Sequence, residues 1–282
     1  MEIIKKIELM QEVSDEWRRG GNIISCVPTM GFLHQGHVEL LSVGREKGDR
    51  LVMTIFVNPT QFGPHEDYER YPQDTEGDLD KARSAGVDAV FMPTVEEMYP
   101  DGFQSTVTVE NITQYLCGKS RPGHFAGVTV VVAKLFNITK PHLAIFGEKD
   151  YQQLIVIKQM VRDLNMDIEI IGVPTVREKD GLAMSSRNNY LSPEERLSAL
   201  SLKKGLDFAK KMVAEGERDS AKIKNAVREL ILSHPFTEID YITICDPEKL
   251  TDMENIDRPS LLALAVRVGK TRLIDNIIVR TN

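Results

Sequence analysis

Cysteine and long apolar runs are both scarce in this 282-residue chain. The three cysteines, Cys26, Cys117 and Cys245, are far apart and outside any paired motif, which argues against a disulfide framework and favours a reducing compartment. No run approaches the roughly 18 apolar residues that a membrane span needs, and residues 1–6 lack the apolar stretch of a signal peptide. We therefore expect a cytoplasmic protein that is neither exported nor inserted into a membrane.

An excess of positive charge is also missing. Lysine and arginine number 35 against 42 aspartates and glutamates, a formal net charge of -7. This balance argues against nucleic acid as a main partner, so an anionic ligand must be met by local positive groups. With 41% hydrophobic and 27% charged residues, the composition is that of a globular protein, and the length allows about two domains.

Short β-branched runs alternate with longer amphipathic stretches in the first part of the chain, which is typical of a parallel sheet covered by helices. Residues 74–85 and 150–164 are predicted helices, and residues 128–136 fit either a helix or a strand. In such a sheet, ligands bind beyond the carboxyl ends of the strands. The predicted strands are residues 23–27, 51–57, 89–92, 143–146 and 168–173.

The pattern changes after Asp180-Gly181. Ser192 to Glu195 forms a capping box with proline at the first helical position. Two helices, 193–214 and 220–233, then precede predicted strands at 239–245, 261–268 and 272–274. We therefore predict an α/β fold, with a Rossmann-like, doubly wound parallel sheet in residues 1–178 and a smaller α+β domain in residues 179–282.

The most informative segment is the junction between the first predicted strand and the next helix. It places His34, Gly36 and His37 near a predicted helix start, with Gly31 in the preceding turn. The three-residue spacing puts both imidazoles on one face, and the backbone N–H groups of the helix start would face a phosphate. Paired imidazoles can stabilise the charge that develops during adenylyl transfer. We interpret H-x-G-H as a nucleotidyl-transfer signature.

Two other interpretations of the histidine pair remain open. A histidine near a helix start can simply cap the helix. A zinc site is the second alternative, but the neighbourhood has neither Cys-x-x-Cys nor His-Glu-x-x-His to supply further ligands.

Two further segments could complete a phosphate site. Gly147 to Asp150 follows a predicted buried strand, and Lys149 there could reach a triphosphate, although such turns are commonly only solvated. Ser185, Ser186 and Arg187 combine two hydroxyls with a guanidinium near the predicted domain boundary. They could clamp phosphate or could form a capping linker. A hinge here would let the second domain close over nucleotide.

Two glutamines, Gln61 and Gln153, follow different predicted strands. Their neutral amides could bind the hydroxyl and carboxylate groups of a small acid, although a lone glutamine is more often a solvated surface residue. Residues 121–125 read as a structural turn.

Five motifs occur in one order along the chain: V-P-T-M-G-F-L-H-Q-G-H, F-V-N-P-T-Q-F, R-P-G-H-F-A-G-V, F-G-E-K-D-Y-Q-Q and M-S-S-R. In these motifs and their spacing the chain resembles the pantoate:β-alanine ligases, from the first strand into the C-terminal domain. The broader similarity is to nucleotidylyltransferases and class I aminoacyl-tRNA synthetases. Phe32 stands where the family pattern leads us to expect a smaller residue.

The resemblance implies specific roles for the motif residues. Gln61 and Gln153 would bind pantoate, with Gln61 also near β-alanine, and Asn58 and Tyr71 would be neighbours of that pocket. His34, His37, Lys149 and Arg187 would be catalytic, with His37 a proton donor. The ATP contacts would be Met30, Gly31, Phe32, Leu33, His34, Gln35, Gly36, His37, Gly147, Glu148, Lys149, Asp150, Val176, Met184, Ser185, Ser186 and Arg187.

The resemblance also implies the reaction and its partners. Pantoate and ATP would form pantoyl adenylate and pyrophosphate with Mg²⁺ as cofactor, and β-alanine would then displace AMP to give pantothenate, in a homodimeric enzyme. Two rivals remain: a nucleotidylyltransferase that keeps the nucleotide in its product, and a binding module that senses nucleotide without turnover. The first would need an acceptor site richer in arginine and lysine, and the second would need no second substrate pocket.

Overall fold

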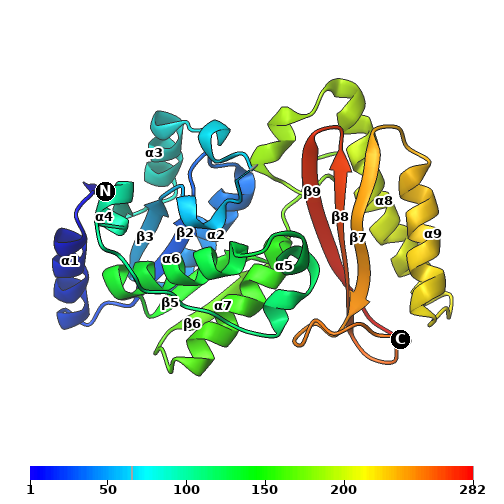
Figure 1. Cartoon of the computed structure of the whole chain (residues 1–282). Helices are drawn as coiled ribbons and strands as arrows, with labels where there is room; N and C mark the ends of the chain where they lie inside the picture. The colour runs from blue at the N-terminus through cyan, green and yellow to red at the C-terminus, as the bar shows by residue number, and fades with distance from the viewer. Residues whose placement is uncertain (65, 282) are drawn as a thin grey trace. The chain divides into compact units, whose positions relative to one another are not determined.

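The computed structural model describes residues 1–64 and 66–281, which form two compact units. The first unit comprises Met1–Glu110, Arg121–Glu148 and Gln153–Pro174 (Figure 1). The second comprises Asn111–Ser120, Lys149–Gln152 and the chain from Thr175 onward. The predicted assignment of residues 1–178 to nucleotide and pantoate binding, and of residues 179–282 to closure over the ATP site, stays a prediction.

A six-stranded parallel sheet forms the centre of the first unit, in the order β1-β4-β3-β2-β5-β6. After β2 the chain adds β3 and β4 on one side of this strand, and later β5 and β6 on its other side. The direction of strand addition thus reverses between β2 and β5, which is the topological switch point of the sheet. The predicted doubly wound, Rossmann-like sheet is confirmed. The strands are β1 (Glu2–Ile4), β2 (Ile24–Thr29), β3 (Arg50–Ile55), β4 (Ala89–Phe91), β5 (Leu143–Gly147) and β6 (Glu169–Val173).

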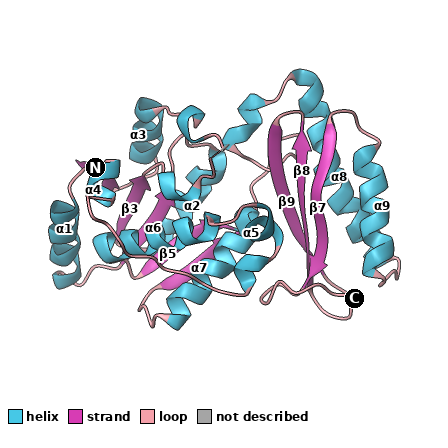
Figure 2. Cartoon of the chain, viewed as in Figure 1, coloured by secondary structure: helices cyan, strands magenta, loops and turns pink. Residues whose placement is uncertain are grey.

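Helices cover both faces of this sheet (Figure 2). Helices α2 and α3 lie over one face, whereas α1, α6 and α7 lie over the other. At Gly44 of α2 an added Cβ would meet Leu51 Cδ1 at 2.8 Å, so this helix packs against β3 at a distance that a larger residue would prevent. The helices are α1 (Ile7–Arg19), α2 (Gln35–Lys47), α3 (Thr75–Ser84), α4 (Val95–Met98), α6 (His124–Thr139) and α7 (Tyr151–Asp163).

The five predicted strands of the first unit are confirmed, with ends shifted by one or two residues. The ambiguous segment 128–136 lies within α6, which is buried over most of its surface and at 16 residues is too long for an ordinary strand. The N-terminal β1 and α1 had no counterpart in the sequence prediction. Strand β1 has only three residues and, among the described residues, pairs with β4 alone. Its local pattern was therefore too short to detect.

The second unit contains a three-stranded antiparallel sheet, β7 (Thr237–Cys245), β8 (Ser260–Val268) and β9 (Thr271–Val279), in that order. Helices α8 (Pro193–Ala214) and α9 (Ser220–Leu232) pack on it around a common apolar core. Ser192 and Glu195 form the predicted capping box at the start of α8. The α+β character of this region is confirmed. This unit also contains α5 (Leu116–Ser120).

Strand β9 is longer than the predicted 272–274. Asp275 interrupts its apolar pattern, and a charged residue does not indicate a buried strand position. In the structure Asp275 is only 2% exposed, and Arg177 binds both of its carboxylate oxygens, at 2.7 and 2.9 Å. Because the paired guanidinium compensates the buried charge, the strand continues to Val279.

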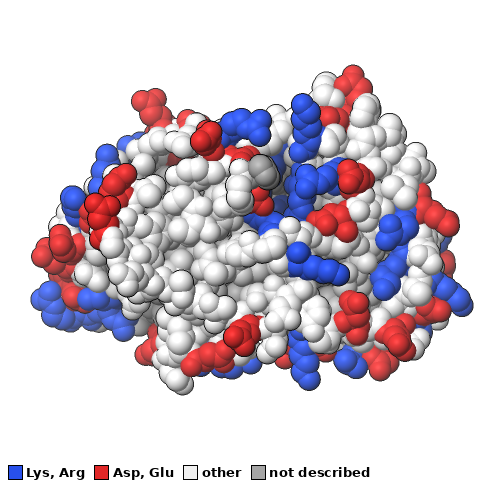
Figure 3. All heavy atoms as spheres, viewed as in Figure 1, with Lys and Arg blue, Asp and Glu red and all other residues white. Residues whose placement is uncertain are grey.

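Charged side chains of both signs are interspersed on the face shown in Figure 3. Within residues 1–64 and 66–281, no helix has both the length and the apolarity needed to cross a membrane. All three cysteines are free, buried thiols, and burial raises the pKa of Cys26 and of Cys245 to about 12.

Candidate active site

The histidine pair lies where β2 gives way to α2, beside the switch point of the sheet. His34 is the N-cap residue of α2 and His37 is its third helical residue. Their rings stack with centroids 4.1 Å apart and an interplanar angle of 27°. The predicted adjacency of the two imidazoles is confirmed.

Both imidazoles also cap the helix. The backbone N–H of Gly36 donates to Nδ1 of His34 at 3.1 Å, and the N–H of His34 donates to Nδ1 of His37 at 3.2 Å. Because each Nδ1 accepts a hydrogen bond, each neutral ring carries its proton on Nε2. The capping role and a catalytic role are therefore compatible, since capping uses one nitrogen of each ring and fixes the tautomer that makes the other a donor.

The backbone N–H groups of this loop have acceptors within the protein. Gly31 N–H donates to the hydroxyl of Thr29 at 3.2 Å, and those of Phe32 and Leu33 donate to Asp78 at 2.7 and 2.6 Å. Within the predicted helix start, the N–H of Gly36 donates to His34 Nδ1 and is therefore not left exposed as expected. Phosphate binding by this helix start stays a prediction. Side chains thus satisfy several backbone donors of the loop within the protein.

Asp78 is a site residue that the sequence analysis missed. It lies in the first turn of α3, 46 residues from Phe32, and is 1% exposed. In the sequence it is one of several acidic residues at a helix start, a position where they are common. No local signal distinguishes it from its exposed neighbours, because its role depends on a tertiary contact.

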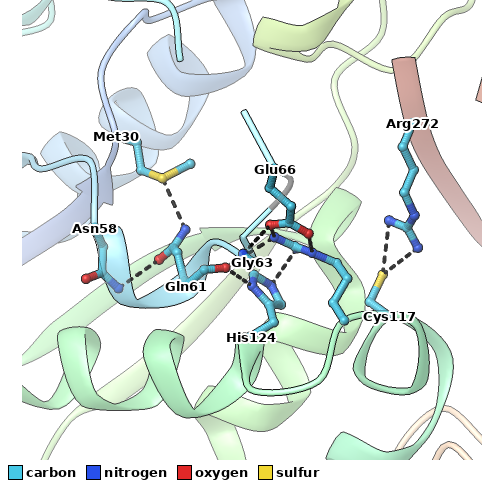
Figure 4. Close-up of polar contacts among 9 residues, drawn as sticks. Met30, Asn58, Gln61, Gly63, Glu66, Cys117, His124 and Arg272 are labelled. Carbon is cyan, nitrogen blue, oxygen red and sulfur yellow. Dashed lines mark hydrogen bonds and ion pairs between the residues drawn. The ribbon is translucent and has the colours of Figure 1, made fainter. Parts of the chain in front are cut away.

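Gln61 ends the 3-10 helix η1 (Pro59–Gln61), which follows β3. Its Nε2 donates to Met30 Sδ at 3.1 Å, and its Oε1 accepts from Asn58 Nδ2 at 3.2 Å (Figure 4). The buried Asn58 is oriented in turn by Tyr99, whose hydroxyl donates to Asn58 Oδ1 at 2.8 Å. This network directs the amide NH₂ of Gln61 toward the side chain of Met30 in the histidine loop.

Helix α6 packs against η1. A Cβ added at Gly127 would lie 2.3 Å from the carbonyl oxygen of Thr60, so only glycine allows this contact. Asn58 Nδ2 also donates to the carbonyl of Gly127 at 3.0 Å. Tyr71, the other predicted neighbour of the pocket, is buried and makes an edge contact with Phe62.

Residues of the turn before α6 contact the backbone carbonyl of Gln61. Arg121 pairs with Glu66 through two short hydrogen bonds, and both Arg121 and His124 contact the carbonyl oxygen of Gln61 (Figure 4). Partial burial tends to raise the pKa of Glu66, but the hydrogen bonds and charge of Arg121 hold that pKa below its usual value. The predicted turn at residues 121–125 is confirmed, and it leads into α6; its purely structural role stays a prediction.

The segment after β5 is shared between the units. Gly147 and Glu148 belong to the first unit, together with the histidine loop, Gln61 and Gln153, whereas Lys149 and Asp150 belong to the second. Lys149 Nζ lies 3.6 Å from Asp150 Oδ2, and the carbonyl of Lys149 accepts from Asn276 Nδ2 at 2.9 Å. The lysine backbone is thereby attached to β9.

The remaining predicted ATP residues belong to the second unit. Met184 N–H donates to the carbonyl of Val176 at 3.0 Å, which closes a short hairpin. Ser185 caps the 3-10 helix η5 (Ser186–Tyr190) through Arg187 N–H at 3.3 Å. Asn188, which the sequence analysis did not select, fixes this segment by donating to Glu178 and to the carbonyl of Ala183.

Comparison with known proteins identifies the family. The chain matches the pantoate-beta-alanine ligase family over residues 2–278. It is 55% identical over 276 residues to the pantothenate synthetase of Syntrophus aciditrophicus, with 98% of this chain and 96% of the relative covered. It is 54% identical to the pantothenate synthetase of Moorella thermoacetica, with both chains covered completely.

Solved structures agree with this assignment. The crystal structure of pantothenate synthetase from Thermus thermophilus is similar with a TM-score of 0.92 and 43% identity, covering 98% of this chain and 99% of that one. A pantoate-beta-alanine ligase from Francisella tularensis, crystallised with beta-gamma ATP and beta-alanine, has a TM-score of 0.80 and 34% identity, covering 99% and 97%. The chain therefore belongs to the pantoate–β-alanine ligase family.

Proposed function

We propose that this protein condenses (R)-pantoate with β-alanine at the expense of ATP, forming pantothenate, the precursor of coenzyme A, with release of AMP and pyrophosphate. The observation that carries the proposal is the stacked pair His34 and His37, whose Nδ1 atoms both accept backbone hydrogen bonds. This arrangement fixes two Nε2–H donors where β2 ends, in a chain that belongs to a ligase family.

The first step activates the acid. A pantoate carboxylate oxygen attacks the α-phosphorus of ATP, a new P–O bond forms, and the bond to the departing pyrophosphate breaks. The Nε2–H groups of His34 and His37, together with Lys149 and Arg187, would stabilise the developing negative charge on the phosphate oxygens. The other proposed ATP contacts are residues 30–33, 35, 36, 147, 148, 150, 176 and 184–186.

The second step forms the amide. The free amine of β-alanine attacks the acyl carbon of pantoyl adenylate, AMP leaves, and the ammonium proton of the adduct passes to a base. Gln61 and Gln153 would bind pantoate through neutral amides, which hold a hydroxy acid without adding a competing charge. Gln61 would also contact β-alanine.

We propose Mg²⁺ as the cofactor, delivered with ATP. Among the described residues, no cluster of three or more His, Cys, Asp or Glu side chains could hold a metal by itself. Mg²⁺ commonly binds substrate phosphates and water with only one or two protein carboxylates, so the donor set fits a metal that arrives on the nucleotide. Such an ion would neutralise triphosphate charge when bound.

A homodimer located in the cytoplasm completes the proposal, with residues 179–282 closing over the ATP site. Light scattering of the purified protein tests the dimer. Small-angle X-ray scattering with and without nucleotide tests closure, and an unchanged radius of gyration would contradict it.

The decisive experiment omits β-alanine. The protein is incubated with ATP, Mg²⁺ and pantoate, and mass spectrometry is used to look for pantoyl adenylate and pyrophosphate. Addition of β-alanine should then convert the adenylate to pantothenate and AMP. A product that retains the nucleotide would instead indicate a nucleotidylyltransferase, and the absence of pantoate-dependent pyrophosphate would contradict the proposal.

A further inference from the structure

The proposed reaction leaves one buried charged group next to the histidine loop without a role. Asp78 reaches the loop from α3 and is 1% exposed. Its Oδ2 accepts from Phe32 N–H at 2.7 Å and its Oδ1 from Leu33 N–H at 2.6 Å. Both carboxylate oxygens are therefore engaged by consecutive backbone donors of the loop, and hydrogen bonds to an ionised acceptor are among the stronger ones in proteins.

The loop requires such an anchor because of its backbone conformation. Gly31 and Phe32 are consecutive residues with positive φ, +83° and +52°. Glycine adopts this region readily, but a bulky residue such as phenylalanine is strained there and stays only where its surroundings hold it. A Cβ added at Gly31 would lie 3.0 Å from Asp78 Oδ2. The carboxylate thus lies directly against the turn that it stabilises.

The turn leads without interruption into the imidazole pair. Leu33, whose N–H is bound by Asp78, is followed by His34, the cap residue whose own N–H donates to His37 Nδ1. A shift of the turn would move the N–H groups that hold both rings. The position and tautomer of His34 and His37 therefore depend on Asp78, whose carboxylate binds the backbone N–H groups of Phe32 and Leu33.

We propose that Asp78 is a positioning residue for adenylyl transfer. Its buried carboxylate holds residues 31–33 so that His34 and His37 present their Nε2–H groups toward the α-phosphate. This inference rests on the proposed function. Because Asp78 acts through the loop, its loss should lower the rate of the first step and leave pantoate binding nearly unchanged.

The test is the substitution Asp78→Asn, which keeps the side-chain shape but replaces one acceptor oxygen by an NH₂ that faces an N–H donor. We expect kcat for pantoate-dependent pyrophosphate exchange to fall roughly 10- to 100-fold, the loss expected from a displacement of catalytic groups by about 1 Å. KM for pantoate should change little. The matched control is Asp80→Asn, an exposed residue of the same helix, which should behave as wild type.

A second measurement separates positioning from a general loss of structure. In NMR spectra that report imidazole nitrogens, wild-type His34 and His37 should both show the Nε2–H tautomer, and Asp78→Asn should show mixed tautomers while the other histidines are unchanged. If the asparagine variant does not fold, Asp78→Glu carries the same test, because it keeps the charge and displaces it by one methylene.

Three outcomes have different meanings. A folded Asp78→Asn enzyme with wild-type exchange and tautomers overturns the inference. A loss of rate that is restored by raising the Mg²⁺ concentration also overturns it, because Asp78 would then be a metal ligand. If the wild-type protein shows no pantoate-dependent exchange, the proposed function fails, and the NMR signals still decide whether Asp78 holds the loop.

Discussion

The two segments of the first unit that are proposed to contact substrates follow neighbouring strands but are held in different ways. In the histidine loop after β2, the buried carboxylate of Asp78 binds two consecutive backbone N–H groups, and the hydroxyl of Thr29 binds that of Gly31. The turn that contains Gln61, after β3, is held by several side chains at once, among them Asn58, Arg121 and His124. The first segment is held mainly through its backbone by buried side chains, whereas the second is held by a partly exposed network of side chains.

The difference matches what each segment is proposed to do. Stabilising a transition state requires donors placed accurately, and a buried anchor in a low-dielectric interior provides that accuracy. Ground-state binding of a small acid does not require donors matched to a developing charge, and individual hydrogen bonds in such a network each contribute modestly. Substitutions in the histidine loop should therefore affect mainly rate, and those around Gln61 mainly affinity or stability.

The largest expected effect is that of His37→Ala. Loss of one charge-stabilising donor should slow pantoyl-adenylate formation by roughly 10² to 10⁴, measured as pantoate-dependent pyrophosphate exchange. His234→Ala, near the end of α9 in the second unit, is the matched control and should exchange normally. Undiminished exchange in His37→Ala would remove this residue from the chemistry.

The complementary substitution in the second segment is Gln61→Ala. Removing the amide should raise KM for pantoate roughly tenfold, the value of one hydrogen bond of about 1.4 kcal/mol, with a smaller change in kcat. Steady-state kinetics with pantoate varied at saturating ATP provides the measurement. A loss confined to kcat would contradict the division between a rate-determining loop and a binding turn.

Gln152 and Gln153, which are adjacent on α7, allow a test that separates a substrate-binding role from a stabilising role. Gln152 is 5% exposed; it accepts from Cys117 N–H and donates to the carbonyls of Ile112 and Tyr115. Gln152→Ala should lower the free energy of unfolding by about 1 to 3 kcal/mol because it leaves these buried groups unsatisfied.

Gln153→Ala is the partner experiment. It should raise KM for pantoate with little effect on stability. Urea unfolding and pantoate kinetics on both variants distinguish the two roles. The reverse pattern would show that the pantoate contact has been assigned to the wrong glutamine.

The smallest expected effect concerns the ion pair between Arg121 and Glu66, next to Gln61. The pKa of Glu66 is lowered in the folded protein, so its contribution to stability is fully present above its usual pKa and is lost as pH falls through the folded value. Glu66→Gln should therefore reduce the free energy of unfolding at pH 7 by about 1 kcal/mol or less, since the pair is partly exposed. The difference from wild type should shrink in acid.

Urea unfolding at pH 7 and at pH 4 or below tests this prediction. Glu69→Gln, an exposed neighbour, is the control and should show no comparable pH dependence. A difference between wild type and Glu66→Gln that grows on acidification would contradict the assigned sign.

Much of the fold could be predicted from the sequence because its signals are local. Strands β2, β3, β4, β5 and β6 have short apolar runs, and the capping box at Ser192 marks the start of α8. The adjacency of His34 and His37 could be predicted as well, because three-residue spacing at a helix start brings side chains together in any helix.

Other features arise only between residues distant in the chain. Asp275 interrupts the pattern of β9, and its burial is explained only by Arg177, 98 residues away. In the sequence, Asp78 looks like any acidic residue at a helix start. Only folding brings its carboxylate to the N–H groups of Phe32 and Leu33.

The sequence by itself determined the parallel α/β architecture, the helical C-terminal region and the family, because periodicity, capping and ordered motifs are properties of short segments. The tertiary structure decided which backbone donors of the histidine loop are already bound, which nitrogen of each imidazole carries the proton, and which buried carboxylate holds the turn. Those features depend on hydrogen bonds between separate elements, and the geometry of such bonds exists only after the chain has folded.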